Sequence, residues 1–215
     1  MKVGVVRVSA FSMSLDGFGA GPNQDLNSPL GVRGGEMFGW VFHTKFFHQM
    51  TGQEGGSEDT DNEIAKSAMA NVGAWILGRN MFGPIRGEWP DDSWKGWWGT
   101  NPPYHCPVYV LTHFPRPSIE MEGGTTFSFV TEGIESALMQ ARQAAGEKDV
   151  RIGGGVATVR QYLTAGLIDE MHLACSDVVM GEGERLLDGI NLHALGFRSI
   201  RRVSTDRATH VFLRR

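Results

Sequence analysis

Short apolar runs alternate along the chain with longer segments of helical periodicity. Runs rich in branched and aromatic residues predict strands at Val3–Phe11, Ala74–Leu77, Pro107–Thr112, Thr126–Val130 and Glu170–Ser176. Apolar positions three and four residues apart predict helices at Glu36–Met50, Asn62–Asn71, Ile134–Ala145 and Val156–Ala165, with Asp61 as N-cap of the second. Strands that alternate with helices are typical of an α/β fold, in which helices cover both faces of a largely parallel sheet.

Two further strand-like runs close the chain, Phe197–Ser204 and Thr209–Leu213, with Asp206 between them. A connection this short joins antiparallel strands, so the sheet is predicted to be mixed. We therefore predict a three-layer α/β fold with a mixed, mostly parallel sheet and a C-terminal antiparallel hairpin. All 215 residues are expected to form a single domain, residues 1–215.

Composition and charge narrow the classes of function. Hydrophobic residues make up 41% of the chain and charged residues 20%, as in globular proteins. The net charge of -4 provides no broad positive field, so nucleic acid is not an expected partner. No stretch approaches the roughly 20 apolar residues that span a bilayer, so we expect a soluble cytoplasmic protein without membrane contact.

A glycine turn lies between a predicted strand end at Ile152 and the helix that begins at Val156. Gly153, Gly154 and Gly155 have no side chains, so the backbone can approach a ligand closely. The helix start, which includes Ala157, offers unpaired N–H groups and a positive dipole end, and this favours a phosphate or the pyrophosphate of a dinucleotide. The alternative is a turn that only reverses the chain.

Several polar residues follow other predicted strands. Arg79 comes directly after a strand and Gly78, while Thr112 and His113 end the next one, so all three side chains are candidates for the same phosphate. Arg79 has the alternative of pairing with a surface carboxylate. Asp16 lies in a loop after the first strand, where α/β sheets build their sites, although it would also shape a turn by itself.

Other features give weaker indications. His43 and His48 are not spaced to share a helix face, and we infer no metal site. The segment 83–104 carries four tryptophans among glycines and prolines, Trp89, Trp94, Trp97 and Trp98. We interpret it as an ordered loop packed by its own indoles, either a wall over a binding site or a subunit contact, and we expect a homodimer.

One alternative from the residues alone is a Rossmann dehydrogenase that uses NAD. Asp177 lies about 22 residues beyond the glycine turn, close to the offset of a ribose-binding acid. The third glycine of that fingerprint is, however, replaced by Thr158, and the turn comes late in the chain.

Four pieces occur in an order that resembles the dihydrofolate reductase superfamily. They are SLDGF at 14–18, ILGRNMF at 76–82, VYVLTH at 108–113 and IGGGVATVRQYL at 152–163, the last followed by IDEMHL at 168–173. The S-x-D-G loop, the GGG turn and GEGERLL at 181–187 are more closely similar to the reductase domain of the riboflavin-biosynthesis deaminase-reductase proteins.

This resemblance implies an NADPH-dependent reductase of the 5-amino-6-(5-phosphoribosylamino)uracil reductase type. It implies that Gly78, Arg79, Thr112 and His113 meet the adenosine 2′-phosphate. It further implies that Gly153, Gly154, Gly155, Val156 and Ala157 bind the pyrophosphate, and that Asp16 belongs to the substrate loop beside the nicotinamide. The implied substrate is a small heterocycle, a phosphoribosylaminopyrimidine. We rank the NAD-dependent Rossmann dehydrogenase below an NADPH-dependent reductase.

The chain also departs from the family pattern. Its residues include no H-x-E and P-C-x-x-C pair, so we expect a reductase without the zinc deaminase half of the bifunctional proteins. Glu36 is a poor match for the acidic residue that protonates a pterin in dihydrofolate reductases, and the loops near 51–62 and 83–104 are insertions. Two alternatives therefore stay open, a dihydrofolate or pterin reductase and a non-catalytic nucleotide-binding protein of the same fold.

Overall fold

The computed structural model describes residues 4–215, so Val3 of the first predicted strand lies outside the described residues. The chain divides into two compact units. Unit 1 contains the described residues up to Arg7 together with Asn71–Leu167, and unit 2 contains Val8–Ala70 together with Ile168–Arg215. Each unit thus combines separate stretches of sequence, and the single domain stays a prediction.

Unit 1 is built on parallel strands that follow the predicted runs. In sheet order they are β7 (Asp149–Gly154), β3 (Val72–Gly78), β4 (Pro107–Leu111) and β6 (Thr126–Val130), with a short antiparallel edge strand β5 (Ile119–Glu120). Because parallel strands align their carboxyl ends, the ends of β3 and β7 lie at the same edge of the sheet.

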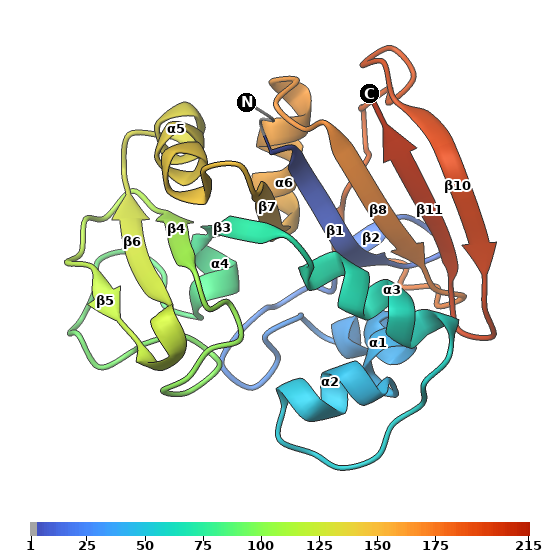
Figure 1. Ribbon diagram of the computed structural model, residues 1–215, viewed down its shortest axis with the longest axis horizontal. Helices are drawn as coiled ribbons and strands as arrows, with labels where there is room; N and C mark the ends of the chain where they lie inside the picture. The colour runs from blue at the N-terminus through green and yellow to red at the C-terminus, as the bar shows by residue number, and fades with distance from the viewer. Residues whose placement is uncertain (1–3) are drawn as a thin grey trace. The chain divides into compact units, whose positions relative to one another are not determined.

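Helices cover both faces of β3. Four consecutive residues, Ala74 to Leu77, are at most 4% exposed, and successive side chains of a strand point to opposite faces. The covering helices are α4 (Arg79–Phe82), α5 (Ile134–Ala145) and α6 (Val156–Thr164), of which α5 contacts β3, β4 and β7 (Figure 1). The predicted α5 is confirmed at both ends.

Unit 2 contains the C-terminal hairpin. β10 (Arg198–Ser204) pairs antiparallel with β11 (Thr209–Arg214), which pairs antiparallel with β8 (Glu170–Cys175) (Figure 1). β1 (Val6–Met13) starts in unit 1 and continues in unit 2, and the strand order among the described residues is β10-β11-β8-β1-β7-β3-β4-β6-β5. The predicted mixed sheet with its antiparallel hairpin is confirmed.

A second, two-stranded sheet in unit 2 has no counterpart among the predictions. It joins β2 (Phe18–Ala20) to β9 (Glu184–Arg185) in antiparallel register. Both strands are too short for a pattern of alternating residues to be visible in the sequence.

Strand β10 forms an edge of the large sheet. Among the described strands it pairs with β11 alone, and it is irregular between Ser199 and Arg201. Ile200 is 54% exposed, and three arginines of the strand, Arg198, Arg201 and Arg202, are exposed as well.

The single helix predicted for Glu36–Met50 is wrong. The structure has a 3₁₀ turn (Gly34–Phe38), α1 (Gly39–Phe42) and α2 (Lys45–Met50) in its place. Thr44 adopts an extended conformation (ψ 147°), and its side chain accepts a hydrogen bond from the Phe47 N–H. A threonine that caps a new helix start interrupts the old one, which the apolar periodicity does not reveal.

The N-cap predicted for the next helix is also wrong. α3 (Thr60–Met69) is capped by Asp59, whose carboxylate accepts a hydrogen bond from the Asn62 N–H. Asp61 lies inside the first turn and is buried. None of the helices in the described part of the chain is long and apolar enough to cross a membrane.

Candidate functional site

The glycine turn in unit 1 joins β7 to α6. The strand continues through Gly154, and Gly155 is the N-cap of α6 without a side chain that bonds the first-turn N–H groups. A Cβ built on Gly155 would meet no atom within 4 Å, so the turn faces open space there. Val156 is buried but Ala157 is exposed, so a ligand at this turn would meet backbone amides and the Ala157 methyl group.

Two of the predicted glycines serve packing within unit 1. A Cβ on Gly78 would lie 2.2 Å from Thr158 Oγ1, and a Cβ on Gly153 would lie 2.5 Å from Leu77 Cδ2. The end of β3 therefore packs directly against the first turn of α6. This close contact is possible because Gly78 and Gly153 have no side chains. Gly154 has a φ of 134°, which L-residues rarely adopt.

Arg79 and Thr112 meet as their positions at neighbouring strand ends predict. Arg79 Nη1 donates to Thr112 Oγ1 over 2.8 Å, and its Nη2 donates to the Gly87 carbonyl over 2.9 Å. No described carboxylate pairs with Arg79. Burial lowers the pKa of Arg79, and the nearby charges of Arg86 and Arg116 lower it further. His113 is exposed and has no hydrogen bond to a described residue.

The sequence analysis did not identify Arg116, whose side chain lies on the same tryptophan ring as Arg79. Its side chain is 2% exposed, and its Nε lies 3.3 Å from Asp92 Oδ1. Its Nη1 and Nη2 atoms are buried without a hydrogen-bond partner, as is Arg79 Nε. The only sequence signal is an isolated arginine between Pro115 and Pro117.

Trp89 contacts both arginines. Its ring centroid lies 3.3 Å from Arg79 Cζ and 4.7 Å from Arg116 Cζ, and its Nε1 donates to the Phe114 carbonyl. We call Arg79, Arg116 and Trp89 the arginine–tryptophan cluster. Two cations thus lie on one indole. The carboxylate bonded to the cluster, that of Asp92, is 80% exposed.

The remaining tryptophans of the loop pack mainly on their surroundings. Trp94 and Trp97 contact each other edge to face with centroids 4.8 Å apart, and Trp94 Nε1 donates to the Phe82 carbonyl. Trp98 is 38% exposed. Trp94 and Trp97 are thus the two indoles of this segment that pack on each other, whereas Trp89 packs on Arg79 and Arg116. The wall over a binding site, the subunit contact and the homodimer stay predictions.

Asp16 lies in unit 2, where its carboxylate is held by three hydrogen bonds. Oδ1 accepts from the Met180 N–H and from Ser14 Oγ, and Oδ2 accepts from the Gly181 N–H. These bonds, that from Met180 first, hold the pKa of Asp16 well below its usual range. Near neutral pH this carboxylate can accept a hydrogen bond or orient a group, but it does not carry a proton to donate.

A buried polar chain in unit 2 also escaped sequence reasoning. The Ala10 N–H donates to His172 Nδ1 (3.1 Å), and His172 Nε2 lies 3.0 Å from His210 Nδ1. His210 Nε2 lies 2.8 Å from Asp61 Oδ1. Because a backbone N–H can only donate, neutral rings must each carry the proton on Nε2, and every link is then satisfied. We call Asp61, His210 and His172 the histidine relay.

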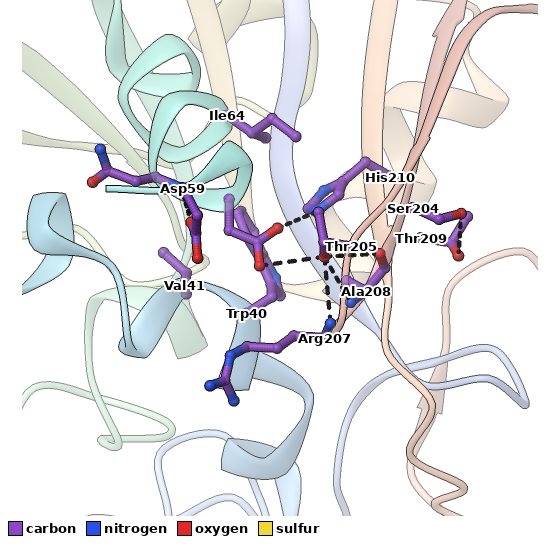
Figure 2. Close-up of polar contacts among 12 residues, drawn as sticks. Trp40, Val41, Asp59, Ile64, Ser204, Thr205, Arg207, Ala208, Thr209 and His210 are labelled. Atoms are coloured by element: carbon purple, nitrogen blue, oxygen red, sulfur yellow. Dashed lines mark hydrogen bonds and ion pairs between the residues drawn. The ribbon is translucent and has the colours of Figure 1, made fainter. Parts of the chain in front are cut away.

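The surroundings of the relay are equally well bonded. Trp40 packs edge-on against both imidazoles, and its Nε1 donates to Ser12 Oγ. Figure 2 shows Thr205 beside His210, hydrogen-bonded to Ala208 in the turn before β11. The relay thus joins β8 and β11 to α3 inside unit 2.

His43 is close to two carboxylates instead of to His48. Ligand atoms of His43, Asp59 and Asp61 all lie within 4.8 Å of one another. His43 Nε2 is bonded to Asp59 at 2.9 Å. Burial acts to raise the pKa of Asp59, but hydrogen bonds from His43, Ser57 and the Asn62 N–H lower it to about 2. The geometry is that of a hydrogen bond between an imidazole and a carboxylate at a helix start.

The mixed sheet, the C-terminal hairpin and the glycine turn define a dihydrofolate reductase-like α/β protein. Dihydrofolate reductase from Enterococcus faecalis, complexed with NADP(H) and RAB-propyl, is a structural neighbour with a TM-score of 0.50 and 14% identity, over 99% of this chain and 95% of the other.

The chain belongs to the RibD C-terminal domain family, whose model matches residues 8–209. A riboflavin biosynthesis protein from Shewanella sp. PV-4 is similar in structure, with a TM-score of 0.55, 21% identity and coverage of 99% of this chain and 98% of that one. The diaminohydroxyphosphoribosylaminopyrimidine deaminase/5-amino-6-(5-phosphoribosylamino)uracil reductase from Thermotoga maritima has a TM-score of 0.57 and 14% identity. The match covers 99% of this chain but 57% of that protein. No curated protein matches the chain.

Proposed function

We propose that this protein is an NADPH-dependent reductase acting on a pyrimidine or related heterocycle. Membership of the RibD C-terminal domain family supports the reaction class. The observation that carries the proposal is the open space in front of Gly155, at the uncapped first turn of α6. Unpaired amides at such a turn suit the pyrophosphate of a dinucleotide.

The residues around this turn fit the cofactor chemically. Gly78 and Gly153 bring the end of β3 against α6, and Arg79 follows Gly78 directly. Arg79 Nε is buried without a partner, as expected of a donor that is completed by an anion. The 2′-phosphate that distinguishes NADPH from NADH is an anion of this kind.

When bound, NADPH would supply hydride to a carbonyl or imine carbon of the substrate, while the protein supplies position and electrostatics. Asp16 is the proposed substrate-orienting residue. Since its carboxylate is ionised, we assign it the role of a hydrogen-bond acceptor, and the proton that accompanies hydride addition must come from another group or from water.

The proposed substrate is 5-amino-6-(5-phosphoribosylamino)uracil, the compound in the name of the Thermotoga maritima protein. A dihydrofolate or pterin reductase is a second candidate, because the fold is shared with dihydrofolate reductase. It ranks lower because Glu36 is exposed and paired with Arg33, so it is not available as a buried acid. A non-catalytic nucleotide-binding protein is the third.

Charge at the α6 N-terminus tests the cofactor assignment. In the Ala157→Glu variant a carboxylate would stand where a phosphate is proposed, although an acidic residue in a first helical turn favours folding. We expect NADPH affinity, measured by calorimetry, to fall at least about tenfold. The neutral Ala157→Gln variant has nearly the same size and should bind several-fold more tightly than Ala157→Glu. Equal affinities of both variants and the wild type would contradict the assignment.

Turnover of the proposed substrate tests the reaction. NADPH oxidation is measured with 5-amino-6-(5-phosphoribosylamino)uracil and, separately, with dihydrofolate. The Asp16→Ala variant should lower kcat by about 100-fold while NADPH affinity stays within about twofold. Equal loss of binding and turnover would mean that Asp16 only holds its loop to Met180. Stoichiometric NADPH binding without oxidation on either substrate would favour the non-catalytic reading.

A further inference from the structure

Arg116 is the least satisfied charged side chain of the arginine–tryptophan cluster. It is nine-tenths buried, and two of its terminal nitrogens have no hydrogen-bond partner. Buried guanidinium donors that stay unpaired carry a desolvation cost, so native proteins usually pair them. Arg116 Nε contacts Asp92, but the Nη1 and Nη2 donors of the same guanidinium group have no acceptor.

Positive charges gather around Arg79 and Arg116, an arrangement that favours an anion. Arg79 and Arg116 both lie on Trp89, and the charge of Arg86 is close enough to act on Arg79. Two like charges on one ring repel each other, and the exposed Asp92 offsets only part of that repulsion. A dianion with several oxygens would supply the negative charge and the hydrogen-bond acceptors that the cluster lacks.

Trp89 positions the guanidinium groups of Arg79 and Arg116. Its Nε1 is bonded to the Phe114 carbonyl, and its ring contacts Phe82 and Phe129 edge to face. Thr112, which accepts from Arg79, also donates to the Phe114 carbonyl. The indole is therefore fixed to the loop that follows β4, and both guanidinium groups are oriented before any ligand arrives.

We propose that Arg116 is a cofactor-specificity residue that binds the 2′-phosphate monoester of the nicotinamide cofactor, on Trp89 as its platform. The inference rests on the proposed function and extends it from Arg79 to a residue that follows β4. Because the Arg116 side chain is 2% exposed and bonded to the exposed Asp92, the phosphate reaches it by displacing the Asp92 carboxylate beside Trp89. Binding should therefore change the fluorescence of Trp89.

The test compares two probes that differ only in the 2′-phosphate, adenosine 2′,5′-bisphosphate and AMP. Calorimetry on the full chain should give the wild type a preference for the bisphosphate of at least about 30-fold. Arg116→Gln should reduce this preference at least about tenfold and leave AMP affinity unchanged. Lys95→Gln is the matched control: it removes an exposed charge from the same loop, outside the proposed site, and should keep the preference within about threefold.

Asp92→Asn provides a variant whose folding is not in question, because Asp92 is 80% exposed. Removal of the carboxylate that competes for Arg116 should tighten bisphosphate binding about threefold without an effect on AMP. The bisphosphate should also change tryptophan fluorescence in the wild type but not in Trp89→Phe.

The outcomes separate this inference from the proposed function. If the wild type binds neither probe nor NADPH, the proposed function is overturned. If NADPH and AMP bind but the bisphosphate has no advantage, only the role of Arg116 is overturned. The same holds if Arg116→Gln keeps the full preference or, where that variant does not fold, if Asp92→Asn leaves both affinities unchanged.

Discussion

The two units each bury a group of polar side chains, and the two groups differ in how completely they are bonded. In the histidine relay of unit 2, Asp61, His210 and His172 form a chain that ends on the Ala10 N–H. In the arginine–tryptophan cluster of unit 1, three guanidinium nitrogens have no hydrogen-bond partner. Both groups are packed against an indole, so apolar surroundings do not explain the difference.

Complete bonding is what a structural network needs, and incomplete bonding is what a ligand can use. A polar network that satisfies every member stabilises and orients the elements around it. Donors that stay unpaired weaken the unliganded protein but strengthen the complex with an anion. We therefore interpret the histidine relay as a structural network of unit 2. The arginine–tryptophan cluster is interpreted as part of the proposed cofactor site in unit 1.

The largest effect on stability is expected from the relay. Asp61→Ala leaves His210 Nε2 without its acceptor in the interior, so the free energy of unfolding should fall by about 3 kcal/mol. Asp59→Ala, two residues earlier, removes the N-cap of α3 and two half-exposed hydrogen bonds, to His43 and Ser57, and should cost about 1 kcal/mol. Urea unfolding followed by circular dichroism measures both. Equal losses would mean that the relay contributes no more than an ordinary helix cap.

The relay should also make stability depend on pH. Burial lowers the pKa of His210 below its usual 6.5, although Asp61 opposes this shift. The unfolded chain then binds a proton more readily than the folded one below about pH 6.5, so stability is complete above that pH and is lost as the pH falls. The loss is at most about 1.4 kcal/mol per pH unit for one group.

His210→Gln removes this titration. Unfolding experiments between about pH 5 and 7 should show a shallower dependence in the variant, by up to one proton. An unchanged slope would mean that another group causes the pH dependence.

The smallest effect on stability is expected from the arginine–tryptophan cluster. Arg116→Met replaces a poorly paired cation by an apolar chain of similar length, and the free energy of unfolding should stay within about 1 kcal/mol of the wild type. Thermal and urea unfolding measure this. A loss as large as that of Asp61→Ala would show that Arg116 is structural, and the contrast between the two clusters would fail.

Much of the fold could be predicted because apolar runs report burial directly. β6 and α5 were predicted with the bounds that the structure gives, since a buried strand and an amphipathic helix each leave a regular pattern. The region 34–50 could not be predicted this way. Its apolar residues fit one long helix, and only the side-chain capping by Thr44 divides it.

The candidate site was predictable where backbone chemistry decides it. Three adjacent glycines before a helix identify the turn, and strand ends bring Arg79 and Thr112 together. Arg116 was not predictable, because its approach to Trp89 depends on how two loops pack. His172 and His210 were missed for a similar reason: they meet across paired strands, and their separation in sequence contains no sign of the contact.

Strand β10 limits how copies of this protein can associate. An open strand edge is a template on which another chain can add its own strand, and such addition leads to uncontrolled assembly. Here a symmetric edge-to-edge pairing would bring the positive charges of Arg198, Arg201 and Arg202 close to those of a second copy. Electrostatic repulsion and the irregularity between Ser199 and Arg201 therefore disfavour self-addition at this edge, and we expect the predicted homodimer to use another surface.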